Sequence, residues 1–365
     1  MTGLGADCPP DLVAAIGDAR RIWIGTHVDP DGDAYGSLLG LGLILRSLGK
    51  TVTLACQDPA PREVDFLPGL ADVVAQPPTD VDLAIAVDAA DCGRLGNLYL
   101  AEGWALLPTV VIDHHGSNPG FGRWNWVAPQ AAATCQMLTA LALREGWPID
   151  RDTARCLLTG ILTDTISFRT TNTTAGTLEA AAALLARGAD LSDLSALIFG
   201  RLPLPGLRLI GRAIERLTVE GPFALTWLNE ADLSDLGARP GDGKEVTRVI
   251  SMAEEPRVVA ILRDKGGGKV DLSLRAKPGV DLLAAAAALG GGGHPQAAGA
   301  RLLCSLEEAK TRVLAALTAH VRLPVEGSTV PAADLGPADL GPADPKPIDL
   351  KPTAPTGDAT VEGSA

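Results

Sequence analysis

The strongest constraint on the fold of this chain is the alternation of strand and helix patterns in its first half. Short apolar runs rich in β-branched residues lie at 22–26, 51–56, 81–87 and 109–112, a pattern typical of strands buried on both faces. A helical pattern at 34–49 separates the first two and ends at Gly49. Because such alternation builds parallel sheets with right-handed crossovers, we expect an α/β fold with a doubly wound parallel sheet.

The rest of the chain divides by pattern into four parts. Residues 130–199 carry Ala and Leu at helical spacing and complete a first domain at 1–200. The segment RLPLPG opens a predicted linker at 201–217. Strand patterns at 223–228, 258–262 and 269–275, mixed with helical ones, predict a smaller α+β domain at 218–323. Residues 324–365 are rich in Pro and Asp and predict a disordered acidic tail.

Composition and charge exclude several classes of protein. With 365 residues and 46% hydrophobic content, the chain can bury a sizeable core. Its net charge of −13 argues against a protein that coats long nucleic acid. No apolar run reaches the roughly 18 residues of a membrane span and no leader pattern opens the chain, so we expect a soluble, cytoplasmic protein. The six scattered cysteines support neither a disulfide framework nor a thiolate zinc site.

Acidic and imidazole side chains follow three of the predicted strands. The first strand runs into HVDPDGD (27–33), the strand at 81–87 into Asp88, and the strand at 109–112 into Asp113, His114 and His115. An apolar helical segment ends at Asp164. The carboxyl ends of parallel strands meet at one edge of a sheet, so we expect these side chains to converge. Converging buried carboxylates need cations, and the sequence therefore predicts a metal site.

The ligand types narrow the choice of metal. Carboxylate and imidazole suit Mn²⁺, Fe²⁺ or Zn²⁺, and Mg²⁺ stays open. Six or more candidate ligands exceed the needs of one ion, whereas a shared carboxylate would hold two ions roughly 3.5–4 Å apart, as in phosphoester hydrolysis. An EF-hand calcium loop is excluded because its sixth and twelfth positions hold Ala34 and Gly40 rather than Gly and Glu.

Five motifs, in order, resemble those of the DHH phosphoesterase superfamily. The first four are THVDPDGDAYGS (26–37), VDAADCGRLG (87–96), VIDHHGSN (111–118) and TGILTDTISF (159–168). The fifth, GGGGHPQAAGA (290–300), resembles the signature of the DHH-associated C-terminal domain. In size and architecture the chain is most similar to the nano-RNase and cyclic-di-AMP phosphodiesterase branch.

The resemblance implies a catalytic first domain with two divalent metal ions, for which we take Mn²⁺ as the expected ion. Asp88 would bridge the two ions and activate, with them, a water that attacks phosphorus. One ion would be held by His27, Asp31 and Asp88, and the other by Asp33, Asp88, His114 and Asp164.

The resemblance also implies roles for the residues around the ions. His115 would face the substrate phosphate and stabilise developing charge. Asp113 would orient an imidazole rather than bind metal. Asn118 would contact a phosphate or a sugar.

The second domain carries a basic region within an acidic protein. Residues 257–301 hold seven Lys or Arg and three Asp. The backbone N–H groups of Gly291, Gly292 and Gly293 can approach a phosphate closely, although four glycines in a row are also typical of a flexible turn. Beside Arg275 and His294, and with the resemblance, we expect a clamp for the 5′ end or the base of a nucleotide.

These observations predict a two-metal phosphodiesterase that hydrolyses short oligoribonucleotides, or small cyclic or linear dinucleotides, to mononucleotides. Alternatives are a phosphatase acting on 3′-phosphoadenosine 5′-phosphate, a longer single-strand 5′ exonuclease, and a nucleotide-sensing module without catalysis. The expected partner is short RNA or a dinucleotide, with no membrane and no long duplex nucleic acid. The aliphatic helices at 174–199 leave a homodimer open.

Overall fold

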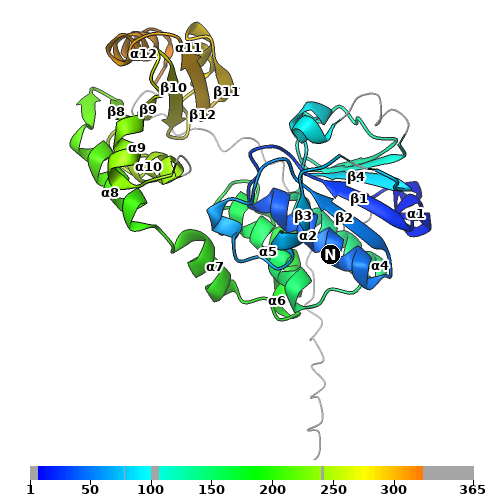
Figure 1. The fold of residues 1–365 in the computed structure, drawn as a ribbon. Helices are drawn as coiled ribbons and strands as arrows, with labels where there is room; N and C mark the ends of the chain where they lie inside the picture. Colours follow the sequence, from blue (N-terminus) through cyan, green and yellow to red (C-terminus); the bar gives the residue numbers. More distant parts are fainter. Residues whose placement is uncertain (1–6, 78, 100–106, 240–241, 324–365) are drawn as a thin grey trace, which may run out of the picture. The chain divides into compact units, whose positions relative to one another are not determined.

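The computed structural model describes residues 7–77, 79–99, 107–239 and 242–323 (Figure 1). The chain separates into two compact units: Met1–Glu215 with Ala231–Arg248, and Arg216–Glu230 with the residues from Val249 onward. The predicted disordered tail at 324–365 lies outside the described residues.

The first unit contains a six-stranded sheet in which every neighbouring pair is parallel. The strand order is β3-β2-β1-β4-β5-β6, the order of a doubly wound sheet, so the predicted α/β fold is confirmed. Two strands escaped prediction, β3 because it has two residues and β6 because its sequence, WNWV, lacks an apolar run. The strands are β1 (Arg21–Gly25), β2 (Thr51–Ala55), β3 (Val73–Val74), β4 (Leu83–Val87), β5 (Thr109–Asp113) and β6 (Trp124–Val127).

Helices cover one face of this sheet, where Ile22 and Ile24 of β1 join the main core. The opposite face buries Trp23, Ala84 and Val111 against the 3₁₀ helix η3 (Cys92–Leu98). The other helical elements before residue 200 are α1 (Pro10–Asp18), α2 (Gly32–Ser47), η1 (Arg62–Val64), η2 (Leu70–Asp72), α4 (Thr134–Glu145), α5 (Arg151–Asp164), α6 (Ala175–Leu185) and α7 (Leu191–Phe199).

Glycines let α2 and α5 approach closely. A Cβ at Gly36 would lie 2.7 Å from the carbonyl oxygen of Cys156, and a Cβ at Gly40 would lie 2.7 Å from the Leu157 side chain. From the other helix, a Cβ at Gly160 would lie 2.5 Å from Asp33 Oδ1. The close contact therefore brings the first turn of α2 beside α5, which ends at Asp164.

The second unit contains a mixed six-stranded sheet in the order β11-β12-β10-β9-β8-β7. Its strands β8 and β9 are parallel and the other pairs are antiparallel. Helices α11 and α12 share a core with one face of the sheet, as expected for an α+β domain. The elements are β7 (Thr218–Glu220), β8 (Phe223–Asn229), β9 (Val258–Asp264), β10 (Val270–Ala276), α11 (Leu283–Ala288), β11 (Gly292–His294), β12 (Ala297–Leu302) and α12 (Leu306–His320).

The predicted linker contains a helix, α8 (Leu204–Glu215). Pro205 lies in its first turn, where a missing N–H costs no intrahelical hydrogen bond, so the prolines mark a helix start instead of an irregular segment. Two short helices follow later, α9 (Glu230–Leu236) and α10 (Gly243–Ile250). Among the described helices, none alone is long and apolar enough to cross a membrane, while α7 and α8 together, across a 55° bend, reach that length and composition.

Candidate metal centre

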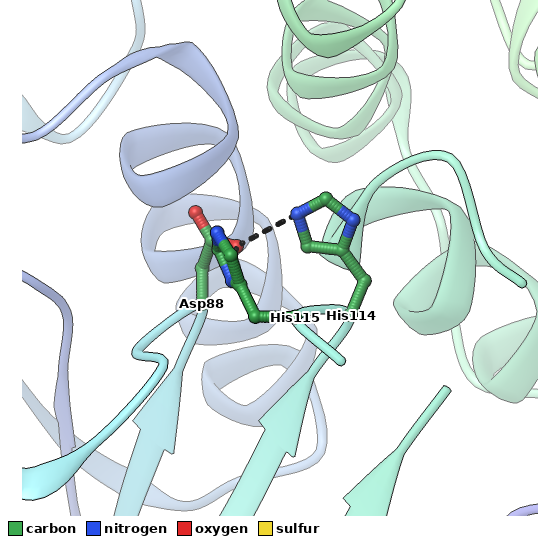
Figure 2. Close-up of side chains that lie close together, drawn as sticks. All are labelled: Asp88, His114 and His115. Carbon is green, nitrogen blue, oxygen red and sulfur yellow. Dashed lines mark ion pairs between the residues drawn. The ribbon is translucent and has the colours of Figure 1, made fainter. Parts of the chain in front are cut away.

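The sheet delivers the predicted site residues to the ends of its central strands. β1 and β4 are neighbours at the point where the winding direction of the sheet reverses, the position at which such sheets bind ligands. Asp88 directly follows β4, and His114 and His115 directly follow β5. Figure 2 shows these three side chains turned toward one another.

His27, Asp31 and Asp88 form the first cluster of potential ligands. The Nε2 atom of His27 lies 3.5 Å from Asp88 Oδ2 and 3.8 Å from Asp31 Oδ1. The Nδ1 atom of His27 is 2.9 Å from the carbonyl oxygen of Val28, which leaves Nε2 to face the cluster. Asp31 also caps α2, because its side chain accepts hydrogen bonds from the backbone N–H groups of Asp33 and Ala34.

Asp33, His114 and Asp164 form a second cluster beside the first. The Nε2 atom of His114 lies 3.3 Å from Asp164 Oδ2 and 4.0 Å from Asp33 Oδ2. It also lies 3.5 Å from Asp88 Oδ1, whereas Oδ2 of the same carboxylate faces His27. Asp88 thus presents one oxygen to each cluster, which is the arrangement that a bridging ligand requires.

The structure therefore brings together all six residues predicted as metal ligands. Asp29, which lies in the same sequence motif, belongs to neither cluster among the described residues. The donors are carboxylates and imidazoles, which fit hard or borderline divalent cations. The binding of metal by these residues stays a prediction. It rests on the cost of burying several carboxylates together, which bound cations would offset.

The electrostatics of the cluster favour cations. Burial raises the pKa of the Asp33 carboxyl well above its usual range, and the charge of Asp88 adds to the effect. Burial and the charge of Asp33 raise the pKa of Asp164 in the same way. Burial opposes protonation of His27, but hydrogen bonds to Asp31 and Asp88 raise its pKa to about 10. At neutral pH a pKa of about 10 keeps His27 protonated in the absence of metal, and a divalent cation would displace that proton.

Asp33 is anchored by a helix distant in sequence. Its side chain is completely buried and accepts hydrogen bonds from the backbone N–H groups of Thr134 (2.5 Å) and Cys135 (2.9 Å), at the start of α4. The Thr134 hydroxyl donates to Asp88 Oδ1 over 3.0 Å. Sequence reasoning missed Thr134 and Cys135, because no local pattern connects the start of a helix with a carboxylate about 100 residues earlier.

Asp88 and the segment after Asp164 have unusual backbone conformations. Asp88 has φ of 55°, in the left-handed region, as it leaves β4. Ile166, Ser167 and Phe168 have φ of 46°, 59° and 65°, directly after α5. Such conformations are costly for residues other than glycine, most of all for β-branched ones, and they gather at functional sites.

Asp113, His115 and Asn118 form a hydrogen-bonded chain beside the clusters. Asp113 is buried and its Oδ1 lies 2.8 Å from Nδ1 of His115, whose pKa this hydrogen bond raises. The His115 side chain is 42% exposed, so its other nitrogen is accessible to a ligand. Asn118 was predicted to contact substrate, but its amide donates to Asp113 Oδ2 and to the carbonyl oxygen of Ala89.

The predicted phosphate clamp lies in the second unit and is more ordered than the glycine run suggested. Gly292 and Gly293 belong to β11, which pairs with β12. A Cβ at Gly291 would lie 2.0 Å from the Gly299 carbonyl oxygen, and a Cβ at Gly293 would also meet the backbone of β12. Of the three predicted glycines, Gly292 alone borders open space, so strand pairing explains the other two.

Arg275 and His294 share one face of the second sheet, because each lies opposite Ala297 of β12. Arg263 of β9 is on the same face, and its guanidinium lies 3.4 Å from the Ser273 hydroxyl. Burial and the charge of Arg263 lower the pKa of Arg275. Among the described residues, no carboxylate lies within ion-pair distance of either arginine; Asp271, opposite Arg263 on the same face, forms its ion pair with Arg301. The basic composition of 257–301 was noted from sequence, but Arg263 was not singled out.

Comparisons with known proteins agree with this geometry. Residues 21–161 match the model of the DHH family N-terminal domain, and residues 231–322 match that of the DHHA1 domain. Bifunctional oligoribonuclease and PAP phosphatase NrnA from Thermus thermophilus is 39% identical over 300 residues, covering 81% of this chain and 89% of that protein.

Two further similarities extend over most of the chain. The protein of the same name from Bacillus subtilis is 27% identical over 311 residues, covering 84% of this chain and 96% of the relative. The crystal structure of an exopolyphosphatase-related protein from Bacteroides fragilis aligns with a TM-score of 0.79 at 24% identity, over 85% of this chain and 95% of that one. The last similarity shows a shared fold.

Proposed function

The chain belongs to the DHH family of phosphoesterases, and from this membership and its metal centre we propose that it uses two divalent ions to hydrolyse short oligoribonucleotides to mononucleotides. Small linear and cyclic dinucleotides are included in the proposed substrate class. The observation that carries the proposal is the division of the Asp88 carboxylate between two clusters of ligands. Mn²⁺ is the proposed ion, since carboxylates and imidazoles supply every donor.

The residues around the centre have separate tasks in this proposal. When bound, two divalent ions would polarise the phosphodiester and lower the pKa of the attacking water. His27 and Asp31 would hold one ion, and Asp88 would face both. His115, fixed through Nδ1 by Asp113, would direct its exposed nitrogen to a phosphate oxygen and hydrogen-bond to the charge that develops there.

The second unit supports recognition of an anionic end group. Arg275, Arg263 and His294 share a sheet face on which the arginines have no carboxylate partner among the described residues. Two guanidiniums on one sheet face suit a terminal phosphate, which carries up to two negative charges. We assign this face to the terminal phosphate or the base of the substrate, and we place the enzyme in the cytoplasm, with its RNA substrates.

A second activity is favoured by a specific observation. The names of the two NrnA relatives include PAP phosphatase. Hydrolysis of the 3′-phosphate monoester and hydrolysis of an RNA diester both expel a ribose hydroxyl and differ in the second ester group on phosphorus, while the same centre would activate water for both. We therefore include 3′-phosphoadenosine 5′-phosphate among the proposed substrates.

Product analysis with Mn²⁺ tests the proposal. Oligoribonucleotides from dimers to decamers, cyclic di-AMP and 3′-phosphoadenosine 5′-phosphate are each incubated with the protein, and the products are separated by chromatography. We expect mononucleotides from the short RNAs, with the dimer among the best substrates. Absence of hydrolysis of every short RNA, under conditions in which the protein binds Mn²⁺, would contradict the proposal.

A further inference from the structure

The Asn118 side chain connects the loops that follow two neighbouring strands. Its Nδ2 atom donates to Asp113 Oδ2 over 2.7 Å and to the carbonyl oxygen of Ala89 over 3.0 Å. Its Oδ1 atom accepts from the backbone N–H of Gly120 over 2.8 Å. An amide carries two donor hydrogens, so both are used inside the protein.

The two acceptors of Asn118 adjoin the reacting groups. Ala89 directly follows Asp88, the residue that faces both clusters with φ of 55°. Asp113 holds His115 through its other oxygen, Oδ1. The amide therefore fills the one side of the Asp113 carboxylate that His115 leaves open, and a carboxylate fixed at both oxygens cannot rotate away from the imidazole.

We infer that Asn118 is a positioning residue, which sets the orientation of His115 through Asp113 and does not contact substrate. The inference rests on the proposed phosphoesterase function, in which His115 meets the phosphate. A contact with a substrate phosphate, one of the two roles first predicted for Asn118, would require a donor that is free, and both donors are engaged. Mutation of a neighbour that orients an imidazole in an active site typically lowers activity by about ten- to a hundredfold.

A double-mutant cycle separates positioning from substrate contact. Asn118→Ala should lower kcat by roughly ten- to a hundredfold with little change in KM, since the orientation of His115 matters after substrate has bound. In a His115→Ala background, the Asn118→Ala substitution should lower kcat by less than about twofold, because the imidazole that Asn118 positions is absent. Equal losses in both backgrounds, or a rise in KM alone, would overturn the inference.

Asn125 provides a matched control. Its amide exchanges two hydrogen bonds with the backbone of Gly122, in the same connection between β5 and β6, and within the described part of the chain neither Asp113 nor Ala89 is among its hydrogen-bond partners. Asn125→Ala should leave kcat unchanged. Should Asn118→Ala prove unfolded by circular dichroism, Asn118→Asp replaces it in the cycle, because its carboxylate keeps the shape and the bond to Gly120 but cannot donate to Asp113.

A measurement without substrate distinguishes this inference from the proposed function. In Mg²⁺-loaded protein, the Nδ1–H proton of His115, assigned by its loss in His115→Ala, should give a low-field NMR resonance. Asn118→Ala should shift or broaden it through faster exchange, while Asn125→Ala should not. Mn²⁺ binding should stay within about threefold in both variants, because neither touches a predicted ligand. An unchanged resonance in Asn118→Ala would overturn the inference even if the chain hydrolysed RNA.

Discussion

At the scale of single residues, the candidate metal ligands could be predicted from the sequence, but the residues that hydrogen-bond to them could not. His27, Asp88 and His114 follow strands, and the rule that parallel strands end at one edge was enough to group them. The hydrogen bonds from Thr134 to Asp33 and Asp88 depend on contacts between segments far apart in the chain. Sequence patterns report periodicity and neighbours along the chain, and they carry no signal for such contacts.

Protons and metal ions should compete for the centre. Hydrogen bonds to Asp31 and Asp88 raise the pKa of His27 to about 10, and burial raises the pKa values of Asp33 and Asp164. A cation bound at Nε2 of His27 must displace its proton, so the affinity for Mn²⁺ should rise with pH up to about pH 10, the pKa of His27. Calorimetry in buffers of different ionisation enthalpy measures both the affinity and the protons released. A flat affinity with no proton release would contradict this assignment.

Mutations in the two units should affect different kinetic constants. Arg275→Ala or His294→Ala should cost roughly 1.5–3 kcal/mol, about ten- to a hundredfold, mostly in KM for dinucleotides. Hydrolysis of bis-p-nitrophenyl phosphate should survive, since that ester has no terminal phosphate or base to bind. His114→Ala should remove both activities. Loss of the generic esterase activity in His294→Ala, to the level of His114→Ala, would refute the division of roles.

At the scale of elements, periodicity predicted the central strands and the main helices. Periodicity did not predict the shortest elements. It also gave no decision where a residue type fits two structures, such as proline in a linker or at the start of a helix. Prolines at 203 and 205 were interpreted as a linker, although they begin α8. Glycines at 290–293 are typical of a flexible turn and were interpreted as part of a phosphate clamp, although two of them, Gly292 and Gly293, belong to β11. Glycine at 32, 36 and 40, a spacing of four, could have indicated the close contact of α2 with α5.

Adding a side chain between α2 and α5 should destabilise the fold and weaken metal binding. Gly36→Ala would place a methyl group 2.7 Å from a backbone oxygen of α5, which cannot rotate away. We expect a loss of about 1–3 kcal/mol in the free energy of unfolding and a weaker affinity for Mn²⁺, because α2 and α5 carry Asp33 and Asp164. Chemical denaturation and a metal titration measure the two effects.

Gly211 of α8 is the control for this helix substitution, because a Cβ there meets nothing within 4 Å. Gly211→Ala should stabilise the protein by up to about 1 kcal/mol and leave metal binding unchanged. If Gly36→Ala and Gly211→Ala changed stability and Mn²⁺ affinity equally, close packing between α2 and α5 would not be what holds the metal ligands in place.

At the scale of the whole molecule, charge sets the length of substrate that we expect. The chain carries −13 overall, while the segment 257–301 holds seven Lys or Arg against three Asp. Long single strands are bound through extended basic grooves, and a strongly acidic protein disfavours them. The value of kcat/KM should therefore fall steeply as RNA is lengthened from a dimer. A long single strand degraded as readily as the dimer would contradict this expectation.

In the proposed mechanism Asp88 joins two metal ions in one centre, and the substitution Asp88→Asn is the sharpest test of that bridge. Asparagine tolerates the left-handed backbone of Asp88 and keeps its shape, but an amide offers one oxygen where the carboxylate offers two. Asp29→Asn is the matched control, since Asp29 has φ of 51° and belongs to neither cluster. The measurement is bound Mn²⁺ per chain, together with kcat on a dinucleotide. We predict two ions and normal turnover for the wild type and Asp29→Asn, and fewer than two ions with a loss of roughly a thousandfold or more for Asp88→Asn. Two bound ions and turnover within about tenfold of wild type in Asp88→Asn would contradict the account.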